Sequence, residues 1–394
     1  MLRLVHYLYH HLYPLQNHSF LHLLHILLAS LQCGLLLFQF AFAIILECIK
    51  LVLLPLKTLY NTTFCITCVM NYKDTNSMNK MLVLLVMLGL VTGCTEISKE
   101  EAAIEAIELD MEVRRFDQLF AQSTINELDN LKGEFPYLFS KKYPDEYWAQ
   151  RFKDTIQIEI NEELAKAYPD FNQEEEELEN LFRHIVYYFP ETTVPKVVTL
   201  ASEVDYRNKV VLADSLLLIG LDTYLGTDHH FYIGIPKFQS KNFRKEQIAV
   251  DVAAAFANQK VSKPRTQDFL SEMIYEGKKL YLMKTLLGET PLQEVFGYTE
   301  SELTFAQENQ INIWEFFIKN ELLYDTDKKL LSRFIDPAPF SKFYLSFDNE
   351  TPGRIGRFIG YEIVASYMSK NDISLKALLN QDATTIFANA KYKP

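Results

Sequence analysis

Cysteine and histidine are scarce over most of this chain. Its 394 residues include five cysteines, and none follows Cys94. No disulfide and no zinc–thiolate site can therefore form beyond that point. The only histidines there are His184, His229 and His230, and no two of them are four residues apart. This excludes the HExxH zinc motif, and we predict no bound metal.

The chain also lacks an excess of basic residues. Its net charge is −12, and the part from Cys94 onward holds 34 basic and 49 acidic residues, a net charge of −15. This acidity argues against a nucleic-acid partner and against direct adhesion to anionic lipid headgroups. Neither a G-x-S-x-G nucleophile motif nor a Walker phosphate loop is present. We therefore predict no catalytic residue and no cofactor.

Residues 78–93 have the pattern of a bacterial lipoprotein signal peptide. Lys80 provides the basic start, and residues 81–91 are an apolar core of about eleven residues, too short to span a bilayer. Val91-Thr92-Gly93-Cys94 then resembles a lipobox, in which small residues precede a cysteine that accepts a lipid. The other interpretation is a short core helix that ends at Gly93. We expect Cys94 to carry acyl chains such as palmitate and to begin the mature protein.

Residues 1–77 precede this signal and have an unusual composition. They hold six of the nine histidines and four of the five cysteines, and residues 20–56 are almost continuously apolar. One interpretation is a membrane segment. We favour an upstream extension that is not native, with translation starting at Met78 or Met81, because the signal peptidase would discard a preceding span. Cys65 and Cys68 have CxxC spacing but no second pair, so we assign them no function.

The rest of the sequence predicts a mostly helical α+β fold. Residues 94–106 are polar and acidic and are interpreted as a tether. No repeat or flexible linker follows, so residues 107–394 are predicted to form a single globular domain, with a small sheet packed on a helical body. Strand patterns cover residues 107–113, 195–201 and 209–219. Helical patterns cover residues 155–167, 173–189, 243–259, 265–287, 301–324 and 351–369.

Three motifs carry a resemblance to a known family. They are Gly220-Leu221-Asp222-Thr223-Tyr224-Leu225-Gly226, Met273-Ile274-Tyr275-Glu276-Gly277-Lys278, and Gly353-Arg354-Ile355-Gly356-Arg357 through Gly360-Tyr361. With the lipobox, they resemble the gliding motility lipoprotein GldB family of Bacteroidetes. The resemblance covers essentially the whole mature chain, and the first heptad is its most specific element. It implies a cell-envelope lipoprotein that is needed for gliding and works alongside the type IX secretion machinery.

A more remote similarity is to zinc peptidases of the HExxH class. The order of strand, corner and two helices is similar, and Glu276 stands where a third zinc ligand would be. The first of those helices carries Asp251 but no histidine. One carboxylate on each of two helices cannot rebuild a zinc site without imidazole or thiolate ligands. The resemblance therefore implies a degenerate zincin-like scaffold without catalysis. The alternative is that the similar order of helices is a coincidence.

The candidate groove of that scaffold comprises Asp222, Tyr224, Asp251, Glu276, Arg354 and Tyr361. Asp222 is expected to cap the helix that the heptad begins, and Glu276 to pair with Arg354 or Arg357. The alternative function is a metal-dependent hydrolase that uses Asp222, Asp251 and Glu276. Asp228-His229-His230 is a weaker candidate for a metal site. The alternative is that these residues form a solvated turn.

We therefore expect a lipid-anchored, non-catalytic binding or assembly component of the gliding and secretion apparatus. Its partners would be the membrane, through Cys94, and other envelope proteins of that apparatus. A further hypothesis is a chaperone-like lipoprotein that protects an exported client. Thr95 is not the aspartate that commonly retains lipoproteins at the inner membrane, so we favour a periplasm-facing position at the outer membrane.

Overall fold

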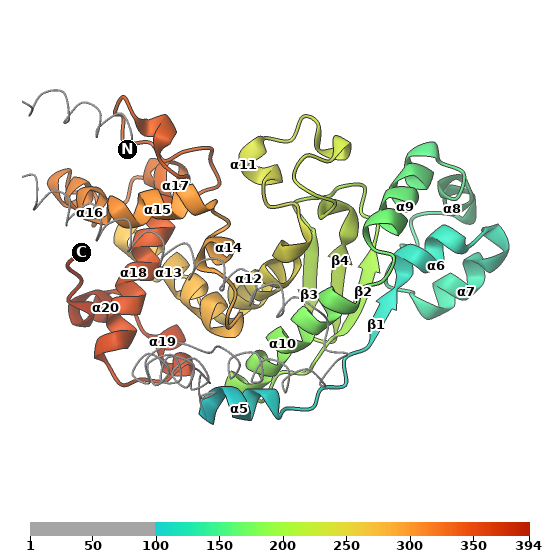
Figure 1. The fold of residues 1–394 in the computed structure, drawn as a ribbon, viewed down its shortest axis with the longest axis horizontal. Coiled ribbons are helices and arrows are strands. Elements are labelled where there is room, and N and C mark those ends of the chain that lie inside the picture. The colour runs from blue at the N-terminus through green and yellow to red at the C-terminus, as the bar shows by residue number, and fades with distance from the viewer. Residues whose placement is uncertain (1–98) are drawn as a thin grey trace, which may run out of the picture. The chain divides into compact units, whose positions relative to one another are not determined.

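A four-stranded sheet lies beside a larger group of helices in the computed structural model, which describes residues 99–394 (Figure 1). The strands are β1 (Val113–Arg115), β2 (Lys196–Leu200), β3 (Val210–Ala213) and β4 (Leu216–Gly220), and their order in the sheet is β1-β2-β4-β3. β1 and β4 pair with β2 in parallel, and β3 pairs with β4 antiparallel at the edge. This mostly helical α+β arrangement confirms the predicted fold class.

The helices fall into two groups along the chain. Those before the β2 strand are α5 (Lys99–Glu105), α6 (Phe116–Gln122), α7 (Leu128–Glu134), α8 (Asp145–Arg151), α9 (Thr155–Ala167) and α10 (Asn172–Tyr188). Those after β4 are α11 (Lys237–Ser240), α12 (Ile248–Lys260), α13 (Phe269–Leu286), α14 (Leu292–Phe296), α15 (Glu300–Glu308), α16 (Gln310–Lys319), α17 (Lys329–Phe334), α18 (Ile355–Lys370), α19 (Leu375–Asn380) and α20 (Ala383–Ala390). None of the described helices combines the length and the apolar character that crossing a membrane requires.

Both faces of the sheet are buried. Alternate residues of a strand point to opposite faces, so Val197, Leu217 and Ile219 join the main core, which includes α10, α12, α13 and α18. Val198 instead belongs to a second cluster with the phenylalanines of α6 and the leucines of α7, and Leu216 and Leu218 pack against it. The apolar run of β4 is thus the sequence of a strand that is covered on both sides.

Several helices begin at residues whose side chains cap the N-terminus. Asp154 accepts hydrogen bonds from the backbone N–H groups of Ile156 and Gln157 at the start of α9. Asp268 accepts one from Ser271 at the start of α13. Each carboxylate satisfies donors that have no partner within the first helical turn.

Helices α13 and α18 cross at glycines. A Cβ atom added to Gly277 would lie 2.2 Å from the backbone carbon of Gly360, and one added to Gly360 would lie 1.8 Å from the carbonyl oxygen of Met273. Neither position has room for a side chain. The two backbones therefore touch, which fixes the spacing of these helices.

Four segments differ in detail from the sequence-based expectation. The strand predicted over 107–113 forms only from its last residue onward, as β1 (Val113–Arg115). The predicted tether contains α5, whose Ile104 is 1% exposed and whose Glu100 accepts a hydrogen bond from Tyr188 of α10. The strand-like stretch 209–219 is a hairpin, because Asp214 and Ser215 form a two-residue turn between β3 and β4. The helix expected over 301–324 breaks at Asn309 into α15 and α16.

Candidate functional site

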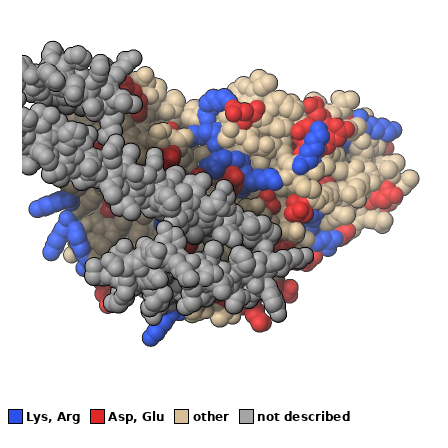
Figure 2. Space-filling view, in the orientation of Figure 1, with Lys and Arg blue, Asp and Glu red and all other residues tan. Residues whose placement is uncertain are grey.

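A pocket of about 580 Å³ lies between the β2–β3 connection, α11, and helices α12, α13, α14 and α18. Six basic side chains line it against three acidic ones. The basic residues are Arg207, Lys209, Lys241, Lys279, Arg354 and Arg357, and the acidic residues are Asp251, Glu276 and Asp336. Figure 2 shows Lys and Arg side chains gathered in a hollow near the middle of the visible face. The pocket is thus basic in a protein whose net charge is strongly negative.

Asp251 enters the pocket from the first turn of α12. Its Oδ2 atom lies 2.5 Å from Nζ of Lys209 and accepts a hydrogen bond of 2.9 Å from the hydroxyl of Tyr224. Nζ of Lys209 also lies 5.4 Å from the centre of the Tyr224 ring. This carboxylate is neutralised by a cation and held by a phenol.

Glu276 enters from the middle of α13 and is 9% exposed. It forms an ion pair with Lys279 one turn later on the same helix, and its Oε2 atom lies 2.9 Å from Nε of Arg357 on α18. The expectation that Glu276 pairs with an arginine is confirmed for Arg357. Burial is the main cause that lowers the pKa of Lys279, while the Glu276 carboxylate opposes it.

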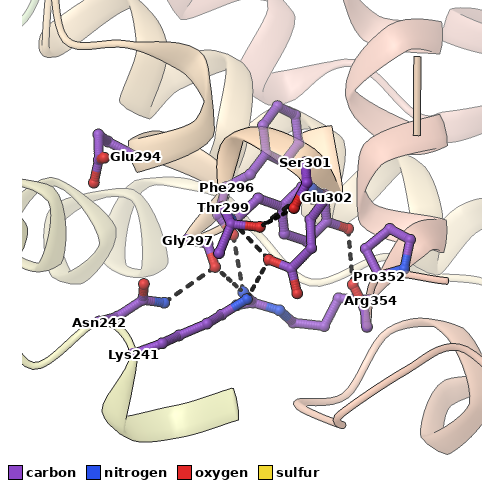
Figure 3. Close-up of polar contacts among 12 residues, drawn as sticks. Lys241, Asn242, Glu294, Phe296, Gly297, Thr299, Ser301, Glu302, Pro352 and Arg354 are labelled. Atoms are coloured by element: carbon purple, nitrogen blue, oxygen red, sulfur yellow. Dashed lines mark hydrogen bonds and ion pairs between the residues drawn. The ribbon is translucent and has the colours of Figure 1, made fainter. Parts of the chain in front are cut away.

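Arg354 holds the C-terminal end of α14, where unpaired carbonyl groups concentrate negative charge. Its Nη2 atom donates to the carbonyl oxygens of Phe296 at 2.9 Å and Gly297 at 3.3 Å (Figure 3). Asn242 donates to the Gly297 carbonyl at 3.1 Å. Burial, followed by the nearby charge of Arg357, lowers the pKa of Arg354 to about 10. The guanidinium therefore stays charged at neutral pH.

Asp222 lies outside the pocket and does not cap a helix, so the capping expectation is wrong. The carboxylate is fully buried and accepts hydrogen bonds from Ser202, through backbone and hydroxyl, and from the Val204 backbone. These residues belong to the turn after β2, where Glu203 and Val204 adopt positive φ of 59° and 57°. Such backbone is strained for residues other than glycine. The carboxylate compensates by satisfying the N–H groups of the turn.

Replacing Asp222 with alanine should lower the free energy of unfolding by about 2 kcal/mol, because the buried N–H groups of the turn lose their acceptor. Chemical denaturation followed by circular dichroism measures this. Asp228→Ala is the matched control: that carboxyl pairs with Lys237 at the surface, where both side chains are mostly exposed, and we expect little change in stability. Equal effects of the two substitutions would contradict the role of Asp222.

The remaining candidates have structural contacts. The carbonyl oxygen of Tyr224 accepts a hydrogen bond from Tyr168, so this residue joins α9 to α12 behind the pocket. The ring of Tyr361 packs against Tyr281 and Phe296. Of the six predicted groove residues, the pocket brings together Asp251, Glu276 and Arg354 and leaves out Asp222, Tyr224 and Tyr361. The three carboxylates of the hydrolase alternative therefore do not share one site.

The histidines are held by other groups. His229 lies 3.3 Å from Glu163, and His230 lies 2.9 Å from Glu159, both on α9. Nδ1 of the buried His184 lies 2.9 Å from the Asn180 carbonyl oxygen. Within residues 99–394, no group of three or more His, Cys, Asp or Glu side chains has an arrangement that could hold a metal ion.

Sequence reasoning missed most of the basic side chains. Lys209, Lys241 and Lys279 come from three separate segments and belong to no motif. Arg357 was named only as a partner of Glu276. The one usable signal was the pair of arginines Arg354 and Arg357 between glycines, in a chain with few basic residues. The predicted lipidation site, Cys94, and the segments 1–77 and 78–93 lie outside the described residues.

Comparison with known proteins gives one match. The family described as gliding motility protein GldB matches residues 97–394. No curated protein and no solved structure matches the chain significantly.

Proposed function

The chain belongs to the gliding motility protein GldB family, and from this premise we propose that it is a non-catalytic binding component of the gliding apparatus. It is anchored in the cell envelope by lipid at Cys94, faces the periplasm, and works with the type IX secretion machinery. The basic pocket is its binding site. In this proposal the protein is non-catalytic because its scaffold is a degenerate, zincin-like one that has lost the ligands for a metal.

One observation carries the non-catalytic part of this proposal: the two carboxylates of the hydrolase alternative that line the pocket, Asp251 and Glu276, already have strong partners. Asp251 is held by Lys209 and Tyr224. Glu276 is held by Lys279 and Arg357. A divalent cation needs several free oxygen ligands, and it would have to displace these cations at a site that is already basic.

The anchoring part rests on the sequence. Residues 78–94 combine a basic start, a short apolar core, small residues and a cysteine. Acyl chains contribute about 0.8 kcal/mol for each buried CH₂ group, and two or more chains hold a protein stably at a membrane. We favour the outer membrane because Thr95 follows the cysteine.

We expect the purified protein to bind no divalent metal at stoichiometric level. After dialysis against magnesium, calcium, manganese or zinc, elemental analysis should find far less than one ion per chain, and none of these ions should raise the melting temperature. One tightly bound ion per chain would contradict the proposal, and its loss in Glu276→Gln would place the ion in the pocket. A calcium-binding protein processed in parallel provides the positive control.

The place in the apparatus is tested by cross-linking in intact cells. A tagged form of the full chain, cross-linked and analysed by mass spectrometry, should capture envelope proteins of the gliding and secretion machinery. Capture of unfolded exported clients alone would contradict a fixed component and favour a chaperone-like role.

A further inference from the structure

We propose that the basic pocket binds a phosphate monoester group carried by a larger organic molecule. This inference names the ligand class of the site in the proposed function and rests on that function. It follows from the charges that line the pocket, the hydrogen-bond donors that remain free there, and the size and lining of the cavity.

The first argument is the charge. Lys241 is paired with Glu302 of α15, so the six basic side chains of the pocket face four acidic ones, an excess of two positive charges, although the mature chain carries 15 more acidic than basic residues. Lys279 and Arg357 form ion pairs with a single carboxylate, Glu276, and Arg354 lines the same pocket. The excess there is two positive charges. A phosphate monoester carries a charge of about −1.5 to −2 at neutral pH, which balances this excess. A single carboxylate would leave one positive charge unbalanced.

The second argument is the set of free donors. Nε of Arg357 is buried and makes no hydrogen bond of acceptable geometry among the described residues, although it lies 2.9 Å from a Glu276 oxygen. The two terminal nitrogens of Arg357 have no hydrogen-bond partner in residues 99–394 either. Arg354 uses only Nη2, for the carbonyls at the end of α14 (Figure 3). Of these donors, only Nε of Arg357 is buried without a hydrogen-bond partner, which is rare in folded proteins. A planar guanidinium fork matches phosphate oxygens.

The third argument is size. A volume of about 580 Å³ falls in the range of pockets that hold small organic ligands and exceeds the need of a bare ion. Five aromatic side chains also line the pocket: Tyr206, Phe238, Phe243, Phe296 and Tyr298. The phosphate is therefore expected to be one end of a ligand whose remainder contacts these rings.

The test uses the processed lipoprotein with its lipid anchor, purified in a non-ionic detergent. The protein is titrated with glycerol 3-phosphate, and binding is measured by calorimetry. We expect saturable binding with one site per chain. Arg357→Gln should weaken binding by about tenfold or more, because a charge-assisted pair is lost. The control Arg183→Gln removes the same charge from α10, where the side chain pairs with Glu179, and should leave the affinity unchanged.

Arg357→Gln also unpairs Glu276, so a second variant is needed that folds without difficulty. Arg207 is exposed at the pocket and has no ion-pair partner in the described chain. Arg207→Gln should weaken binding by about two- to fivefold, as expected for an exposed charge. The proposal is overturned if glycerol 3-phosphate does not bind, if neither pocket variant weakens it, or if succinate binds equally well.

Two further arms identify the source of the phosphate. Short-chain phosphatidate, dissolved in the same micelles, binds more tightly than glycerol 3-phosphate if the ligand is a lipid headgroup. It binds no more tightly if the ligand is soluble. Release of inorganic phosphate is measured in the same samples. Release that depends on Arg357 would support the phosphate site while refuting the non-catalytic function, so the two failures are distinguishable.

Discussion

Replacing Gly360 with valine is expected to leave the protein unfolded at growth temperature, or to lower its free energy of unfolding by about 3 kcal/mol or more. The first side-chain carbon would lie 1.8 Å from the Met273 carbonyl oxygen and 2.5 Å from its carbonyl carbon. Both atoms belong to the backbone of α13, so no side-chain rotation can relieve the clash. Denaturation followed by circular dichroism measures the effect, and Gly360→Ala should give a smaller loss in the same direction.

Gly133→Ala is the control for glycine substitution as such. Gly133 is an exposed position of α7, and an added Cβ atom would meet nothing within 4 Å. Alanine favours the helix there, so we expect a gain of roughly 0.5–1 kcal/mol. If the free energy of unfolding of Gly360→Val instead lies within about 0.5 kcal/mol of that of the unmodified protein, α13 and α18 do not cross as described.

The second large effect concerns the anchor. Replacing Cys94 with alanine should abolish acyl labelling and block removal of the signal, because we propose that the lipid is attached to this thiol. Cells fed a labelled fatty acid should show no label on the variant, and its mass should remain that of the precursor. In the unmodified protein, the labelled product should have the mass of residues 94–394 plus lipid.

Cys65→Ala and Cys68→Ala are matched controls, since both positions precede the expected signal. Labelling should be unchanged in each. Label that persists in Cys94→Ala would refute the lipobox, and a stable, processed product with peptides from residues 1–77 would overturn the expectation that this segment is not part of the mature protein.

Local signals in the sequence predicted the longest helices, although not the short helices α11, α14, α17, α19 and α20. The stretch 155–167 coincides with α9, because Asp154 caps its start and an apolar face repeats along it. The hairpin of β3 and β4 was not separated into two strands, since its turn has no glycine and both strands are apolar. Helix boundaries at Asn309 were likewise invisible to a periodicity that continues through α15 and α16.

The site was only partly predictable because its chemistry depends on contacts between distant segments. Glu276 and Arg357 are 81 positions apart, and Asp251 meets a lysine 42 positions earlier. The sequence drew attention to the carboxylates, as it would for an enzyme, whereas the geometry gives Asp251 and Glu276 a cation each. Asp222 shows the same limit: its partners lie in a strained turn that composition does not reveal.

A basic cavity in a strongly acidic protein has a consequence for access. Charges are screened over about 8 Å at physiological ionic strength, so the attraction of Arg354 and Arg357 extends little beyond the entrance. At greater range, a long polyanion such as an acidic polysaccharide meets mainly like charge and is repelled. If the pocket binds an anion as proposed, we expect the protein to bind a small anion more readily than a polymer of the same charge.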